Sequence, residues 1–180
     1  MREQDIDKYL TQLGQSLDNS GIHLPVRILI IGGTFMLTQI RNRSITEDID
    51  VIFTDIVDRH ASPIYQAISQ AAKAIAIRDN LREDWFNDGM SHLLRVMGDI
   101  PEGNLWKRYG ALEVYLPPAG YILTLKLLSY RDKDKDDIEA LCRLLQIGTR
   151  EQAQNMVNIY VPDTSTHDIF RLDETLEKLF

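Results

Sequence analysis

The sequence predicts a mixed α/β fold in which helices flank a small sheet and the C-terminal half is helical. Short runs of strand-forming residues at 26–31, 48–53 and 111–116 are typical of β-strands. Apolar residues at helical spacing precede, separate and follow these runs. The chain has 180 residues, of which 44% are hydrophobic, so it can bury a sizeable core. We expect a core at residues 1–117 and a helical region at 118–180 packed on it as one compact unit.

The first elements are a helix and a buried strand. Helical spacing over residues 4–18 is carried by Ile6, Tyr9, Leu10, Leu13 and Leu17. Asn19-Ser20-Gly21 ends this helix, and the β-branched run 26–31 follows Pro25 as a buried strand. Gly32-Gly33 ends that strand, and residues 34–40 are expected to form a short helix against the sheet.

The later elements are a second strand, a long helix, a third strand and several helices. On the strand 48–53, alternation places Asp48, Asp50 and Ile52 on one face. Ser62-Pro63 predicts the start of a helix that runs to about residue 77. Polar residues 79–99 are expected to form helix and loop, and Pro117-Pro118 ends the strand 111–116. From residue 121 the chain is expected to be helical, with a capping box at 149–152 and a last amphipathic helix at 168–180.

Composition and charge narrow the class of protein. The formal charge of −7 argues against a protein built for non-specific nucleic-acid binding. Arg41 with Arg43 and Lys107 with Arg108 are expected to be solvated surface, with a local basic patch for nucleic acid as the alternative. Cys142, the single cysteine, cannot form an internal disulfide and suggests a reducing, cytoplasmic setting. No membrane span and no signal peptide are expected, because the longest apolar run is interrupted and the N-terminus is polar.

Two carboxylates at i and i+2 predict a metal site. Asp48 and Asp50 would point the same way from one strand, and hard oxygen ligands suit Mg²⁺ or Mn²⁺ shared with substrate phosphates. Such a pair can hold two ions about 3.5–4 Å apart. A polar, solvated strand face is the other interpretation of an Asp-x-Asp pattern alone.

The turn Gly32-Gly33-Thr34 predicts a phosphate site. Glycines between a strand and a helix let backbone N–H groups approach an anion, and the helix N-terminus favours negative charge. The Thr34 hydroxyl is a further donor to a phosphate oxygen. The alternative is a tight strand-to-helix turn. The pattern is neither a P-loop nor a Rossmann fingerprint, because the required lysine and third glycine are missing.

The order strand, Gly-Gly-Thr, helix and Asp-Ile-Asp-Val resembles the polymerase-beta-like nucleotidyltransferase superfamily. The resemblance implies that Gly32, Gly33 and Thr34 contact the triphosphate and that Asp48 and Asp50 hold the metals. Arg43 and Thr46 resemble the Arg and Ser/Thr that precede Asp-Ile-Asp in a toxin-like branch, which implies a part in nucleotide binding.

A charged block after residue 125 resembles one branch of that superfamily. Lys126-Leu127-Leu128, followed by the block 130–138, is similar to the signature of abortive-infection (AbiEii-like) nucleotidyltransferases. The resemblance implies that Lys126 faces the triphosphate and that Asp134 or Asp137 orients the acceptor or acts as a base. The spacing also fits a solvated helix on which Arg131 pairs with Asp134 and Asp137.

Two further segments bear on this resemblance. Residues 84–88, Asp-Trp-Phe-Asn-Asp, resemble a segment of small bacterial relatives whose role is unassigned. The superfamily also implies a third metal-binding carboxylate on the strand beside the Asp48 strand. Glu113 is the one acid in the run 111–116, so it is the candidate third ligand, and a surface position is the equal alternative.

The function implied by the resemblance is metal-dependent nucleotidyl transfer. A nucleoside monophosphate would pass from an NTP to an RNA end, such as transfer RNA, or to a protein hydroxyl. The branch implies a toxin–antitoxin or phage-defence component with a cognate antitoxin as partner. The alternative is a catalytically weak protein that keeps the fold and the nucleotide pocket and regulates a partner.

Overall fold

The chain divides into two units in the computed structural model, which describes residues 1–56, 58–59 and 61–180. One unit comprises Met1–Ser91 with Gly103–Leu116, and the other comprises His92–Glu102 with Pro117–Phe180. One boundary lies between Leu116 and Pro117, and the expectation of a single compact unit stays a prediction. The segment 92–102 differs from the expectation, because it belongs to the second unit although it lies within the first unit's stretch of sequence.

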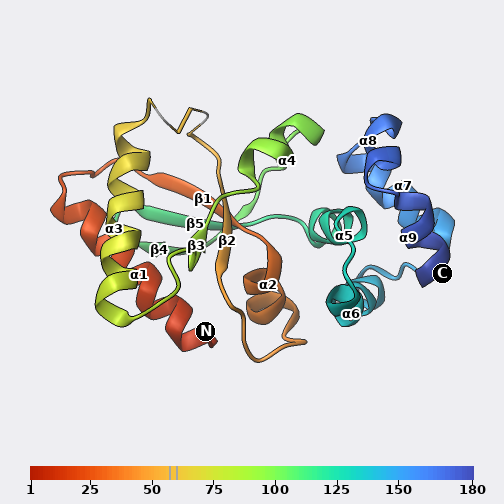
Figure 1. Ribbon diagram of the computed structural model, residues 1–180, viewed down its shortest axis with the longest axis horizontal. Coiled ribbons are helices and arrows are strands. Elements are labelled where there is room, and N and C mark those ends of the chain that lie inside the picture. Colours follow the sequence, from red (N-terminus) through yellow and green to blue (C-terminus); the bar gives the residue numbers. More distant parts are fainter. Residues whose placement is uncertain (57, 60) are drawn as a thin grey trace. The chain divides into compact units, whose positions relative to one another are not determined.

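A five-stranded mixed sheet forms the centre of the first unit, in the order β3-β2-β1-β5-β4 (Figure 1). The strands are β1 (Val26–Ile30), β2 (Ile49–Phe53), β3 (Phe86–Asn87), β4 (Asn104–Tyr109) and β5 (Leu112–Leu116). The central strand β1 is antiparallel to β2 and parallel to β5. At the edges, β3 is parallel to β2 and β4 is antiparallel to β5. The predicted mixed α/β class is therefore confirmed.

Two helices, α1 (Glu3–Asn19) and α3 (Pro63–Asp79), lie side by side in the first unit (Figure 1). The predicted start of α3 is confirmed, since the Ser62 side chain caps it by accepting a hydrogen bond from the backbone N–H of Tyr65. The buried Trp85 indole donates to the carbonyl of Ala72 on α3 at 2.9 Å. Helix α3 covers the face of the sheet that carries Phe53, whose ring contacts Tyr65.

Strands β3 and β4 are absent from the sequence-based expectation. β3 has only two residues, both of which pair with β2. Two residues are too few to show the alternation of apolar and polar side chains that predicts a strand. β4 forms a hairpin with β5 across Gly110 and Ala111, and most of its residues are exposed or half-buried. An edge strand with little buried surface lacks the apolar alternation that reveals a strand.

The second unit is helical in its described part, as predicted. Its helices are α4 (Ser91–Met97), α5 (Ala119–Leu128), the 3₁₀ turn η2 (Asp132–Asp134), α6 (Lys135–Leu145), α7 (Arg150–Tyr160), α8 (Thr164–Ile169) and α9 (Leu172–Leu179). The capping box of Thr149 and Gln152 is confirmed at the start of α7. The single last helix is wrong, because Arg171 adopts a left-handed conformation that separates α8 from α9. No helix among the described residues has the length and apolar character to cross a bilayer.

Candidate functional site

The glycine turn after β1 lies directly against Asp50 of β2. The short helix α2 (Gly32–Phe35) begins at the turn and continues into the π-helix η1 (Met36–Ile40). The Ile31 N–H donates to the Asp50 carbonyl at 2.9 Å, which holds the turn beside β2. Gly32 has a φ of +61°, and a Cβ there would lie 2.3 Å from Asp50 Oδ2. Both the backbone conformation and the close approach of the carboxylate therefore require glycine.

Two threonine hydroxyls hold the backbone at Asp48. Thr34 Oγ1 donates to the Asp48 carbonyl at 2.9 Å, and Thr46 Oγ1 donates to the same oxygen at 3.1 Å. Both threonines are buried. The Thr34 hydroxyl thus joins the glycine turn to the start of β2, and its contact with a phosphate stays a prediction.

Arg43 also lies at the glycine turn. A Cβ at Gly33 would lie 2.5 Å from Thr46 Oγ1 and 3.0 Å from an Arg43 guanidinium nitrogen. The glycine turn, Arg43, Thr46, the Asp48 carbonyl and the Asp50 carboxylate thus come together within the first unit. A cation and a glycine turn beside a carboxylate are groups that can interact with a phosphate and a metal ion.

Burial and nearby carboxylates raise the pKa of Asp48. Burial raises the pKa of this half-buried carboxyl, Arg82 lowers it, and the carboxylates of Asp84 and Glu47 raise it further. The net pKa lies above the ordinary value. Since Arg82 itself pairs with Glu47 at 3.2 Å and Asp84 at 2.7 Å, its charge is shared among several acids. A cation bound beside Asp48 would favour its charged form and lower its pKa.

Asn87 is a site residue that the sequence-based reasoning did not assign. It lies on β3 opposite Asp50, and its Nδ2 donates to Asp50 Oδ1 at 2.9 Å. The available signal is the resemblance of the segment 84–88 to a segment of small bacterial relatives that has no assigned role. Its role depends on β3 pairing beside Asp50, which the sequence did not predict.

Glu113 does not join the two aspartates, and its assignment as a third metal ligand is corrected. Strand β1 separates β5 from β2, and Glu113 is opposite Arg27 whereas Asp50 is opposite Ile31. Four residues correspond to about 13 Å along a strand. Glu113 instead pairs with Arg108 at 2.8 Å and Arg27 at 3.5 Å, and the hydrogen bond from Arg108 lowers the pKa of its carboxyl.

The fit of Asp48 and Asp50 to a magnesium ion depends on how many ligands the protein itself must supply. Across residues 1–56, 58–59 and 61–180, no group of three or more His, Cys, Asp or Glu side chains is arranged for a metal. Mg²⁺ does not need such a group, because it is commonly bound by one or two carboxylates together with substrate phosphates and water. Asp50 is half-buried and its Oδ2 faces the glycine turn, which agrees with a cation held at this carboxylate.

A buried ion-pair cluster in the second unit brings together Lys126, Asp134 and Asp137. Lys126 Nζ lies 2.6 Å from Asp134 Oδ1 and 2.7 Å from Asp137 Oδ2. Their exposed fractions are 6%, 1% and 1%, so the solvated-helix interpretation is wrong for these residues. The acids also lie on separate elements, η2 and α6, rather than on one charged helix.

Arg131 extends this cluster at the surface. Its Nε lies 2.8 Å from Asp134 Oδ2, and its own side chain is 59% exposed. Burial alone would raise the pKa of Asp134, but the hydrogen bonds and charges of Arg131 and Lys126 outweigh it and hold the pKa below its usual value. Asp134 is therefore a stable anion inside the second unit.

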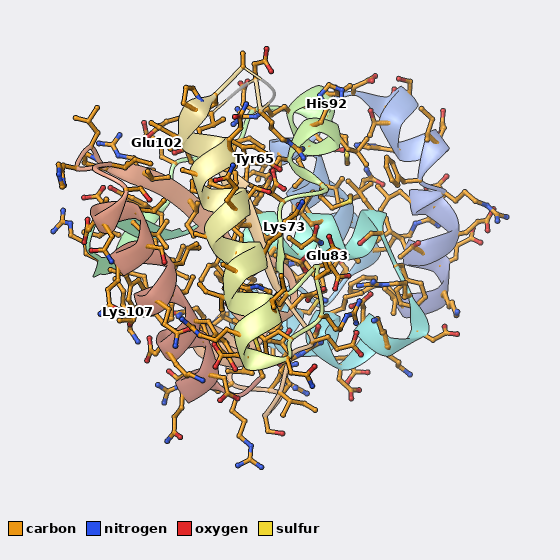
Figure 2. The ribbon with its side chains drawn as sticks, turned by 60° about the vertical axis from the view of Figure 1, so that its left-hand side comes forward. Tyr65, Lys73, Glu83, His92, Glu102 and Lys107 are labelled. Atoms are coloured by element: carbon orange, nitrogen blue, oxygen red, sulfur yellow. The ribbon has the colours of Figure 1, made fainter. Side chains whose placement is uncertain are left out.

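A cavity of about 60 Å³ lies elsewhere in the first unit, between α3 and the strands β2 and β3. Its lining includes Phe53, Tyr65 and Phe86, and Figure 2 shows Tyr65 and Lys73 on α3 with Glu83 in the segment that follows. Since Phe53 alternates with Asp50 and Ile52 along β2, the cavity lies on the other face of the sheet from the aspartates. No residue of the glycine turn or of Asp48 and Asp50 lines it.

Protein-family models, curated proteins and solved structures give no match to this chain. The chemistry of the site therefore rests on its own residues. Those residues are a glycine turn, an arginine, two half-buried carboxylates and an asparagine amide, all within the first unit.

Proposed function

We propose that this chain is a metal-dependent nucleotidyltransferase, with a nucleotidyltransferase-like first unit. It would move a nucleoside monophosphate from an NTP to an acceptor hydroxyl. The observation that supports the proposal most strongly is the contact of the glycine turn with Asp50, in which only glycine at position 32 leaves room for the carboxylate. The backbone that we propose to bind phosphate and the acid that we propose to bind metal therefore lie in contact.

Different residues of the first unit would bind the triphosphate and the metal. The N–H groups of the turn at Gly32 and Gly33 would face the triphosphate, and Arg43 would supply positive charge beside them. Asp48 and Asp50 would hold Mg²⁺ or Mn²⁺. When bound, the metal would neutralise phosphate charge and lower the pKa of the attacking hydroxyl.

The reaction is an in-line displacement at the α-phosphorus. The acceptor oxygen forms a bond to phosphorus, the bond to the β-phosphate oxygen breaks, and pyrophosphate leaves with the electron pair. The hydroxyl proton is released to a base or to water. Catalysis of this kind depends on positioning and charge neutralisation, so it needs no covalent enzyme intermediate.

Lys126, Asp134 and Asp137 keep the roles that the resemblance implies as proposals: a cation for the triphosphate, and an acceptor-orienting group or base. Their mutual ion pairs also support a second role, because a buried lysine bridging two buried acids holds η2 and α6 against α5. The two roles differ in their consequences, since a structural role changes stability whether or not a nucleotide is bound.

The acceptor is proposed to be an RNA end, such as that of transfer RNA, or a protein hydroxyl. A setting as a toxin–antitoxin or phage-defence component, with an antitoxin as partner, belongs to the same proposal. The direct experiment incubates the protein with each labelled NTP, Mg²⁺ or Mn²⁺, total RNA and cell protein. The labelled macromolecule then identifies both the base and the acceptor.

The paired acids provide the decisive variants. Asp48→Ala with Asp50→Ala should reduce label transfer to the level seen without protein, because no carboxylate remains beside the turn. Asp168→Ala, which alters an exposed acid of α8, is the matched control and should transfer label at the wild-type rate. Transfer by the double variant at the wild-type rate would refute the assignment, provided that its urea unfolding shows a folded protein.

A second candidate function is nucleotide binding without efficient transfer, in a protein that regulates a partner. The observation that favours it is Asn87, an uncharged amide on the strand beside Asp50, together with the distant position of Glu113. Calorimetry with each NTP and Mg²⁺ separates the two functions. Binding without label transfer to any macromolecule supports the regulatory protein, and the absence of all nucleotide binding contradicts both.

A further inference from the structure

Asn87 makes a directed contact with Asp50 at the edge of the sheet. The register of β2 and β3 places the two residues opposite each other, and Asn87 Nδ2 donates to Asp50 Oδ1 at 2.9 Å. The second carboxylate oxygen, Oδ2, is the atom nearest to the position that a Cβ on Gly32 would occupy. One oxygen of Asp50 is therefore held by β3 while the other faces the glycine turn.

The orientation of the Asn87 amide is set by a second hydrogen bond. The backbone N–H of Gly89 donates to Asn87 Oδ1 at 3.0 Å, so this atom is the acceptor and Nδ2 is the donor. An amide turned the other way would leave the Gly89 N–H without its acceptor and place an oxygen against the Asp50 carboxylate. The chain therefore directs the donor of Asn87 at Asp50.

We propose that Asn87 is a positioning residue that orients Asp50 for the metal and triphosphate. The inference rests on the proposed function and extends it, because it assigns a role to the segment 84–88. Hydrogen bonds to side chains that bind a metal fix their orientation, and removal of such a partner costs about 10–100-fold in metal affinity or activity. Because its side chain is an uncharged amide, Asn87 holds the Asp50 carboxylate without adding negative charge beside it.

The test uses Mn²⁺ binding to the full chain, measured by the loss of the free-ion electron paramagnetic resonance signal. Asn87→Leu keeps a similar size and removes the donor, and Asn87→Ala is a second variant in case leucine disturbs β3. Asn104→Ala, at an exposed asparagine of the opposite edge strand, is the matched control. We expect both Asn87 variants to bind Mn²⁺ about 10–100-fold more weakly than wild type, and the control to bind as wild type does.

A double-variant comparison tests whether Asn87 acts through Asp50. In an Asp50→Ala background, residual Mn²⁺ binding would depend on Asp48, and Asn87→Leu should weaken it no further. An equal loss in both backgrounds would overturn the positioning role, and so would wild-type Mn²⁺ binding by both Asn87 variants.

The assay also distinguishes this inference from the proposed function. Absence of Mn²⁺ and NTP binding in the wild-type protein refutes the proposed function and the role of Asn87 with it. Binding and transfer by wild type that both Asn87 variants retain in full refutes the role of Asn87 alone. In active protein, the expected change is a fall in kcat that is larger than the change in KM for the NTP.

Discussion

Replacing Gly32 with alanine tests the contact on which the proposed site depends. Gly32 has a φ of +61°, and a left-handed conformation costs a non-glycine residue about 1–2 kcal/mol. The new Cβ would also lie 2.3 Å from Asp50 Oδ2, so the carboxylate or the turn must move. Overpacking of this kind typically costs about 1–3 kcal/mol. We therefore expect Gly32→Ala to lower the free energy of unfolding by about 2–5 kcal/mol.

Gly21 provides a control with the same backbone conformation and no contact. Its φ is +76°, and a Cβ there would meet no atom within 4 Å. Gly21→Ala should therefore cost only the backbone part, about 1–2 kcal/mol. The difference between the two variants, measured by urea unfolding under identical conditions, is the cost of displacing Asp50.

The Asp50→Ala background isolates that contact. Once the carboxylate is gone, the contact at 2.3 Å is removed and the nearest remaining atom is the Cβ of residue 50 at 3.2 Å. The substitution should therefore cost less than it does in the wild-type background, and its cost should approach that of Gly21→Ala. In the transfer assay, Gly32→Ala should reduce the rate strongly, because Asp50 no longer faces the turn, whereas Gly21→Ala should leave it unchanged. Equal unfolding free energies for the two glycine variants, with unaltered transfer, would refute the proposed site geometry.

Two further predictions concern the buried cluster of the second unit. Lys126→Met should lower the free energy of unfolding by about 3–5 kcal/mol, because it leaves Asp134 and Asp137 buried without their shared cation; a loss below about 1 kcal/mol in urea unfolding would contradict this. The pKa of Asp134 in the folded protein lies below its usual 3.8, so its stabilising contribution is present above that pH and is lost as the pH falls through the lower folded value. As the pH falls from about 5 to about 1, the free energy of unfolding of Asp134→Asn should therefore fall by less than that of wild type. An equal fall in the two proteins would contradict the stabilising ion pairs of Asp134.

Local sequence patterns were sufficient for much of the framework and for the centre of the site. The apolar spacing of α1, the Ser62 cap of α3 and the strands at β1, β2 and β5 all follow from residues close together in the chain. The glycine turn and Asp48 with Asp50 also lie within about 20 residues. Strands β1 and β2 are consecutive along the chain, and consecutive strands usually pair or neighbour each other in a sheet.

The packing of elements against one another explains what the sequence-based reasoning missed. The alternation along β5 predicts that Glu113 lies on the face of Asp50. The strand order, however, inserts β1 between β5 and β2, and the register places Glu113 four residues from Asp50 along the strands. The burial of Lys126 between two acids was likewise not predicted. Neither result is encoded in local spacing, because each depends on which elements pack together.

The sequence by itself determined that a strand, a glycine turn and two acids occur in an order that suits a metal and a phosphate. Periodicity and turn chemistry act over a few residues, so they can be recognised without a structure. Only the tertiary structure decided that Asp50 fills the space beside Gly32, that Asn87 rather than Glu113 contacts it, and that the Lys126 cluster is buried. Strand order, register and burial arise from contacts between residues distant in the chain, and a single sequence does not display those contacts.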